Sequence, residues 1–204
     1  MVQSLCRRFI LLFLLGAILF GCAGSPPVRF YTLHPLQGAG GVTERKESAG
    51  NLIIAVGPIR FPDYLDRPEI VTRGATPTQM RFSEFNLWAG SLPEGFSNVL
   101  VDNLTALFAG EKVILLANRT RPGGVDYQVL MEVLHFEGPL GGDVLLVARW
   151  TIVRVKDKQW LFVQSSRISE PSGGPGYEAF VEAQSRALER LGREIGEAIQ
   201  KLPR

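Results

Sequence analysis

The hydrophobic pattern of the chain predicts eight β-strands and two long helices, in the order four strands, helix, four strands, helix. Runs rich in β-branched, aromatic and alternating apolar residues, bounded by Gly and Pro, mark the strands. The first four are predicted at 29–36, 52–59, 69–73 and 79–87, and the second four at 112–117, 126–137, 143–156 and 159–169. A tight turn at 157–158 predicts that the last two strands form a hairpin.

Both helices are predicted from apolar stripes that recur with helical spacing. The first begins at Ser91, which has capping-box spacing to Glu94, and ends at Gly110. The second runs from Tyr177 to about Lys201, with an apolar face on which Gln184 is the single polar residue.

This order shows no regular alternation of strand and helix, which favours the α+β class over α/β. We expect a single domain at 29–204, built from a largely antiparallel sheet with both long helices packed on one face. Residues 37–50 are rich in Gly with mixed charges and are predicted to form a flexible loop within it.

The N-terminus has the pattern of a bacterial lipoprotein signal peptide. Arg7 and Arg8 precede an apolar run at 9–20, which as a helix spans about 18 Å and is too short to cross a bilayer. The following sequence, Leu-Phe-Gly-Cys, resembles a lipobox, with Phe20 in place of the usual small residue. We therefore expect residues 1–21 to be a signal peptide and 22–28 to be a tether. We expect Cys22 to be lipidated, with palmitate among its acyl chains. The alternative is an ordinary signal peptide ending near Ala23.

Lipidation at Cys22 implies stable attachment to a membrane, because two or more acyl chains give lasting anchorage. Ala23 stands where an aspartate signals retention in the inner membrane of many Gram-negative bacteria. This favours the periplasmic face of the outer membrane. Cleavage after residue 21 removes two arginines and leaves 20 basic and 20 acidic groups, so the mature protein is formally neutral.

Composition excludes several classes of function. The net charge of +2 lacks the cationic excess of a nucleic-acid-binding protein. Two cysteines exclude a disulfide scaffold and a thiolate zinc site, and two histidines, His34 and His135, lie too far apart for a local metal motif. We expect neither a metal nor a cofactor.

Candidate catalytic residues are few. The chain has no G-x-S-x-G motif. His34 and His135 lie on predicted strands, where a hydrogen-bonded structural histidine is the common case. Asp63 and Asp66 are spaced for acid–base chemistry but equally for capping a turn. We expect that the protein is not an enzyme.

Two features are candidates for contact with a partner. Gly192 and Gly196 are four residues apart in the last helix, which indicates close approach either to the sheet or to another subunit. The Pro-flanked loop at 62–68 carries Tyr64, Leu65, Asp66 and Arg67. Tyr64, Leu65 and Trp88 are either core residues or interface anchors, and the sequence leaves both open.

Four segments carry a family resemblance: Phe-Tyr-Thr-Leu at 30–33, Ile-Ala-Val-Gly-Pro at 54–58, Tyr-Leu-Asp-Arg-Pro-Glu-Ile-Val at 64–71 and Phe-Asn-Leu-Trp-Ala at 85–89. In this order and spacing the chain resembles the ABC-type transport auxiliary lipoprotein family, the PqiC-like proteins that accompany MCE-domain lipid transporters. The resemblance covers the first half of the mature chain well and the second half in its pattern of elements.

The resemblance implies an accessory role without catalysis. It implies an outer-membrane-tethered partner of a periplasmic MCE-domain protein in lipid transport between the membranes, supporting envelope integrity, with a homo-oligomeric ring as the assembly. Alternatives are another outer-membrane assembly or cell-wall accessory lipoprotein, and, less favoured, a periplasmic hydrolase. The loop at 64–68 matches a distinctive family segment, with a role in docking or in folding.

Overall fold

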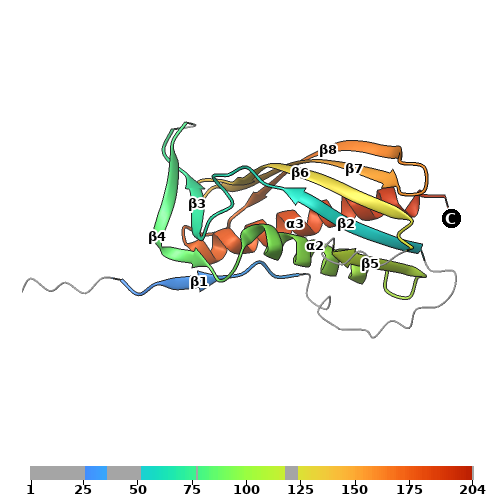
Figure 1. The fold of residues 1–204 in the computed structure, drawn as a ribbon. Coiled ribbons are helices and arrows are strands. Elements are labelled where there is room, and N and C mark those ends of the chain that lie inside the picture. Colours follow the sequence, from blue (N-terminus) through green and yellow to red (C-terminus); the bar gives the residue numbers. More distant parts are fainter. Residues whose placement is uncertain (1–25, 36–51, 77, 118–123, 204) are drawn as a thin grey trace, which may run out of the picture.

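The computed structural model describes residues 26–35, 52–76, 78–117 and 124–203, and the fold is given for these residues. They form a five-stranded sheet, a three-stranded sheet and two long helices (Figure 1). Cys22 and residues 37–50, on which the lipidation and flexible-loop predictions rest, lie outside the described residues.

The larger sheet has the strand order β5-β2-β6-β7-β8. Its strands are β2 (Leu52–Arg60), β5 (Val113–Ala117), β6 (Tyr127–Glu137), β7 (Asp143–Arg154) and β8 (Gln159–Pro171). β2 is parallel to both β5 and β6, and β6, β7 and β8 form an antiparallel meander. The β7–β8 turn contains Lys158 at φ 57, which confirms the predicted hairpin.

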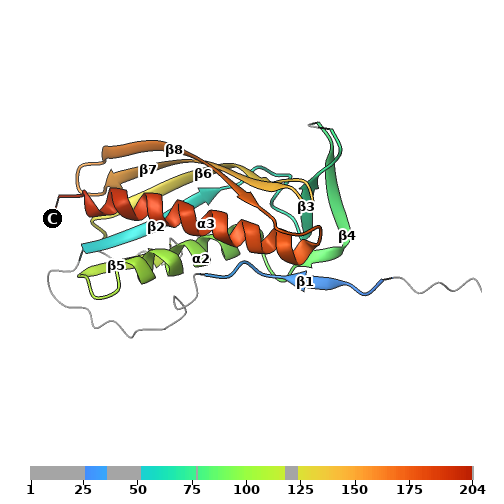
Figure 2. The same cartoon turned by 180° about the vertical axis from the view of Figure 1, so that it is seen from behind.

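Both helices cover the same face of this sheet, as predicted. α2 (Leu92–Leu107) packs on β2 and β5, and α3 (Tyr177–Gln200) packs on β7 and β8. The helices also pack on each other, and Figure 2 shows α3 lying along the length of the sheet. Apolar side chains from the two helices and the inner sheet face form one core, in which Phe96, Phe136, Phe180 and Leu191 are fully buried.

The smaller sheet lies at one end of the molecule and has the order β1-β4-β3 (Figure 1). It consists of β1 (Arg29–Tyr31), β3 (Glu69–Arg73) and β4 (Met80–Trp88), with β1 parallel and β3 antiparallel to β4. The Arg73 amide donates to the Gly138 carbonyl over 2.9 Å, which joins the smaller sheet to the end of β6.

The α+β class is confirmed, with three differences in detail. The strands form two sheets rather than one, and three of their pairings are parallel. The predicted strand at 29–36 ends at Tyr31, because the chain then leaves β4 and the His34 amide donates to Ser185 Oγ on α3. Ser91 stands at the N-cap of α2, but its side chain makes no capping hydrogen bond.

Candidate functional site

The loop between β2 and β3 is held against its own domain through Tyr64 and Leu65. Leu65 is 2% exposed and belongs to the core. The Tyr64 hydroxyl lies 3.2 Å from both the Leu134 carbonyl and Glu137 Oε2, so it is hydrogen-bonded to β6. Tyr64 and Leu65 therefore contact their own domain, and their part in a contact with a partner stays a prediction.

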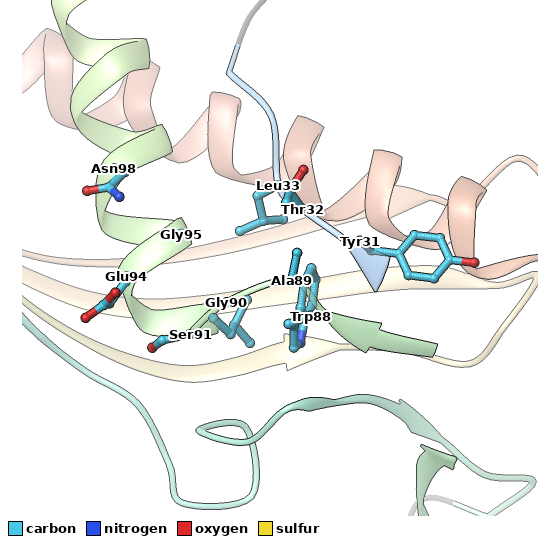
Figure 3. A pocket seen from close by; sticks show the side chains of 11 residues that line it. Tyr31, Thr32, Leu33, Trp88, Ala89, Gly90, Ser91, Glu94, Gly95 and Asn98 are labelled. Carbon is cyan, nitrogen blue, oxygen red and sulfur yellow. The ribbon is translucent and has the colours of Figure 1, made fainter. Parts of the chain in front are cut away.

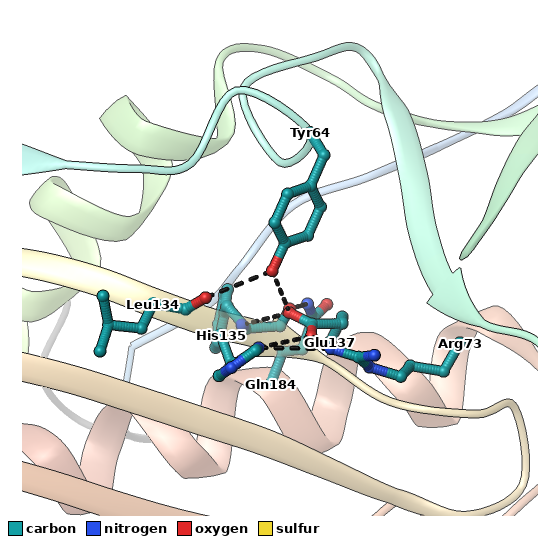
Figure 4. Close-up of polar contacts among 7 residues, drawn as sticks. Tyr64, Arg73, Leu134, His135, Glu137 and Gln184 are labelled. Carbon is teal, nitrogen blue, oxygen red and sulfur yellow. Dashed lines mark hydrogen bonds and ion pairs between the residues drawn. The ribbon is translucent and has the colours of Figure 1, made fainter. Parts of the chain in front are cut away.

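A buried carboxylate, Glu137, is the centre of this arrangement (Figure 4). Its side chain is 0% exposed and lies 2.7 Å from Arg73 Nη2 and 2.9 Å from His135 Nδ1. It also accepts a hydrogen bond of 2.7 Å from the Phe136 amide. Buried carboxylates are stable when paired and hydrogen-bonded. Glu137 thus ties together the loop, β3 and β6.

Burial raises the pKa of the Tyr64 phenol well above its ordinary value of about 10, and the nearby negative charge of Glu137 raises it further. Tyr64 therefore acts as a neutral hydrogen-bond donor, which agrees with its contacts to a carbonyl and a carboxylate.

The outward side of the loop carries Asp63 and Asp66, both exposed, and Arg67. The Arg67 guanidinium lies 4.1 Å from the centre of the Phe82 ring on β4, and its Nε donates to Glu69 over 3.0 Å. Through these two contacts Arg67 mainly holds the loop against the smaller sheet. Of the four loop residues predicted as partner contacts, Asp66 alone is fully available at the surface.

A shallow hollow of about 240 Å³ lies at the same end of the molecule, where the chain leaves β1 (Figure 3). Its walls are the segments Tyr31–Leu33 and Trp88–Ser91 and the first turns of α2. Trp88 itself is 6% exposed and is a core residue. Ligand pockets usually measure about 300–1,000 Å³, so the hollow suits a side chain better than a whole lipid.

Gly192 and Gly196 are buried beneath α2 of the same chain. A Cβ on Gly192 would lie 3.4 Å from Asn103 Cβ, and one on Gly196 would lie 3.2 Å from Leu107 Cδ1. Within this chain the close approach is therefore to α2 and not to the sheet. Both glycines are buried in this chain, and their contact with another subunit stays a prediction.

The histidines have structural contacts. His34 Nε2 lies 3.2 Å from Glu182 Oε2 on α3, and His135 belongs to the Glu137 cluster. Within the described residues no group of His, Cys, Asp or Glu is arranged to hold a metal ion. No helix in the described part of the chain is long and apolar enough to span a membrane.

Sequence reasoning missed Glu137, Arg73 and Gln184 as a set. Gln184, the polar residue on the apolar face of α3, donates from Nε2 to the Phe136 carbonyl over 2.8 Å, next to Glu137. The available signal was the presence of two polar residues, Glu137 and Gln184, in otherwise apolar patterns. Such residues are commonly buried and paired.

Comparison with known proteins gives a consistent result. The family described as "ABC-type transport auxiliary lipoprotein component" matches residues 31–196. Intermembrane transport lipoprotein PqiC of Escherichia coli (strain K12) is 25% identical over 186 residues, which cover 91% of this chain and 94% of the relative.

Two solved structures share the fold. An uncharacterized protein superposes with a TM-score of 0.69 at 21% identity, covering 85% of this chain and 99% of the other. Protein XCC0632 of Xanthomonas campestris superposes with a TM-score of 0.59 at 18% identity, covering 83% and 90%. The family that matches is one of transport auxiliary lipoproteins and not of enzymes, in agreement with the sequence analysis. The chain belongs to the ABC-type transport auxiliary lipoprotein component family.

Proposed function

We propose that the protein is a periplasmic accessory lipoprotein of an MCE-type intermembrane lipid transport system, anchored in the outer membrane through Cys22. The observation that carries this proposal is the match to an intermembrane transport lipoprotein over 91% of this chain and 94% of the relative. The shared length includes the lipobox region as well as the folded domain, so the proposal covers anchor and domain together.

The anchor has a clear physical purpose in this proposal. Acyl chains on Cys22 hold the domain at one membrane surface, which raises its effective concentration near any partner that reaches that surface. Six residues separate Cys22 from Arg29, the first residue of β1. The folded domain therefore stays close to the membrane, with its smaller sheet at the anchored end.

Exposed apolar side chains at this end support a binding role. Val28, Phe30 and Phe82 are 48%, 65% and 45% exposed, and Phe30 and Phe82 belong to the smaller sheet. Exposed aromatic residues of this kind are typical of contact surfaces. In the proposed assembly they contact the membrane, the MCE-domain partner or a neighbouring copy in a homo-oligomeric ring.

Affinity purification of the full-length protein from membranes tests the partner. The expected result is recovery of an MCE-domain protein with the tagged wild type. Recovery of outer-membrane or cell-wall assembly proteins without an MCE-domain protein would contradict the proposal and favour the alternative class of accessory lipoprotein.

Replacement of the anchor tests the location. Cys22→Ala removes the acylated sulfur, so we expect loss of labelled palmitate and release of the protein into the soluble periplasmic fraction. Cys6→Ala, in the signal peptide, is the matched control and should leave both unchanged. A Cys22→Ala protein that still fractionates with the outer membrane would contradict the proposed anchor.

A further inference from the structure

β8 is the edge strand of the larger sheet, and its outer edge has two different halves. The carbonyls of Ser169 and Pro171 accept hydrogen bonds from side chains on α3 and therefore point away from β7. Alternate residues of a strand direct their backbone groups to the same side. The register with β7 is continuous from Val163 to Pro171, so the backbone groups of residues 163, 165 and 167 also point outward.

A row of α3 side chains follows this edge, at residues 186, 190, 194, 197 and 201. Arg186 and Arg190 occupy the end of the edge: they donate to the carbonyls of Pro171 and Ser169 over 2.6 and 3.2 Å. Both also pair with Glu170. This half of β8 is thus closed by the protein's own cations, a common protection of edge strands.

The other half of the edge faces carboxylates instead of arginines. Glu194 accepts a hydrogen bond from Ser166, which in turn accepts one of 2.9 Å from Trp150 Nε1. Glu194, Glu197 and Lys201 border a hollow of about 230 Å³ between α3 and the side chains of Phe162 and Gln164. Carboxylates cannot donate to the outward carbonyls of β8, and in the described part of the chain no hydrogen bond joins Lys201 to them, so this half of the strand is left open.

The opposite face of the open half carries two exposed apolar side chains at its start, and the exposed Ser165 and Arg167 follow on the same face. Trp160 and Val163 are 67% and 64% exposed, and they pair with Val153 and Thr151 on the sheet face that carries no helix. A strand added beside β8 would therefore place alternate side chains in two different environments. One set would meet Trp160 and Val163, and the other would enter the hollow beside Glu194 and Glu197.

We propose that the open half of β8, residues 159–167, binds an extended segment of a partner protein by strand addition, and that this segment alternates apolar and basic residues. Backbone hydrogen bonds to residues 163, 165 and 167 supply the affinity, as in other strand-addition complexes. The basic residues pair with Glu194 and Glu197, which outnumber Lys201, and the apolar residues cover Trp160 and Val163. The proposal does not depend on lipid transport or on the anchor.

Binding of a fluorescein-labelled Lys-Val-Lys-Val-Lys-Val-Lys peptide to the mature protein tests the proposal. We expect saturable binding in fluorescence anisotropy and slower hydrogen exchange of the amides of Val163, Ser165 and Arg167. A Lys-Lys-Lys-Lys-Val-Val-Val peptide of the same composition is the control and should bind at least about tenfold more weakly, because it cannot pair its side chains with both faces. Absence of binding, or equal binding of both peptides, would overturn the proposal.

Ser165→Pro tests the backbone contacts. It removes an outward N–H and leaves the ladder to β7 intact, as Pro171 already does at an outward position. We expect the peptide affinity to fall by at least about tenfold, while Ser165→Ala, which keeps the N–H, binds as the wild type does. Unchanged melting temperatures would show that both variants are folded, and equal affinity of the proline variant would refute strand addition.

Charge reversal tests the contribution of the acidic hollow. Glu197→Lys should weaken binding of the alternating peptide by about fivefold, and the same reversal at the exposed Glu84 on β4, in the other sheet, should not.

Sedimentation of the free protein tests whether a second copy of the chain occupies the edge instead. If the wild type forms a dimer that Ser165→Pro abolishes, the edge binds a second copy and the proposed partner segment is wrong.

Discussion

Arg73→Met probes how firmly the smaller sheet is fixed to the body of the molecule. The variant keeps the length and apolar stem of the side chain and removes the charge that lies 2.7 Å from Glu137, whose side chain is fully buried. Breaking a buried ion pair from one side costs about 3–5 kcal/mol. Arg73 is 29% exposed, so water reaches part of the site, and Tyr64 and the Phe136 amide still donate to Glu137. We therefore expect destabilisation of about 2–3 kcal/mol.

Urea unfolding monitored by tryptophan fluorescence measures this loss, with Arg81→Met on β4 as the control. Arg81 is exposed, so its replacement should change the free energy of unfolding by less than about 0.5 kcal/mol. The double variant Arg73→Met with Glu137→Gln should recover at least about 1 kcal/mol relative to the sum of the single variants, because the uncompensated charge is then gone. Additive effects would refute the argument that Arg73 acts through Glu137.

Three further predictions concern the core and its titration. Tyr64 keeps its proton in the folded state at pH values where the unfolded chain loses it, because its folded pKa is raised; the resulting stability is present below about pH 10 and lost as the pH rises further. Tyr64→Phe should therefore flatten the fall in melting temperature between about pH 10 and 11 relative to the wild type. Gly192→Ala should stabilise the protein by up to about 1 kcal/mol in chemical denaturation, since the new Cβ lies at ordinary contact distance, whereas Gly196→Ala should gain less because its Cβ meets Leu107 at 3.2 Å. Leu191→Ala should cost about 2–5 kcal/mol in the same assay, because the side chain is fully buried, and an unchanged midpoint would show that it is not a core residue.

Much of the fold was predictable because periodicity reports burial on one face. The stripe of α3 and the alternation in β6 and β7 placed these elements within two residues of their observed bounds. The division into two sheets was not predictable in this way. β3 pairs with β4 locally, but β1 joins β4 from 57 positions away, and the contacts that hold the smaller sheet on β6, such as Arg73 with Glu137, join residues 64 positions apart.

The loop at 62–68 shows why residue type alone leaves two interpretations open. Tyr, Leu and Arg are frequent anchors in interfaces, and they are equally frequent where a loop must be fastened to its own domain. Which of the two roles a tyrosine has depends on whether its own domain offers a hydrogen-bond acceptor for the hydroxyl. Here the Leu134 carbonyl and Glu137 on β6 accept from Tyr64. The glycines of α3 pose the same problem. Their spacing indicates close packing of the helix backbone, but it does not identify the element that packs against it.

The position of β1 has a mechanical consequence for a tethered protein. β1 is the first element after residues 26–28, and its three residues pair in parallel with Asn86, Leu87 and Trp88 of β4. With Cys22 acylated as proposed, a pull between the membrane and a bound partner acts along the axis of β1 and loads these pairings together, in shear, instead of opening them one by one. The load then passes to β4, whose last residue, Trp88, is buried and lies four residues before α2. Tension on the anchor would thus be carried into the helical layer of the core, so the domain could resist displacement without any change in its binding surfaces.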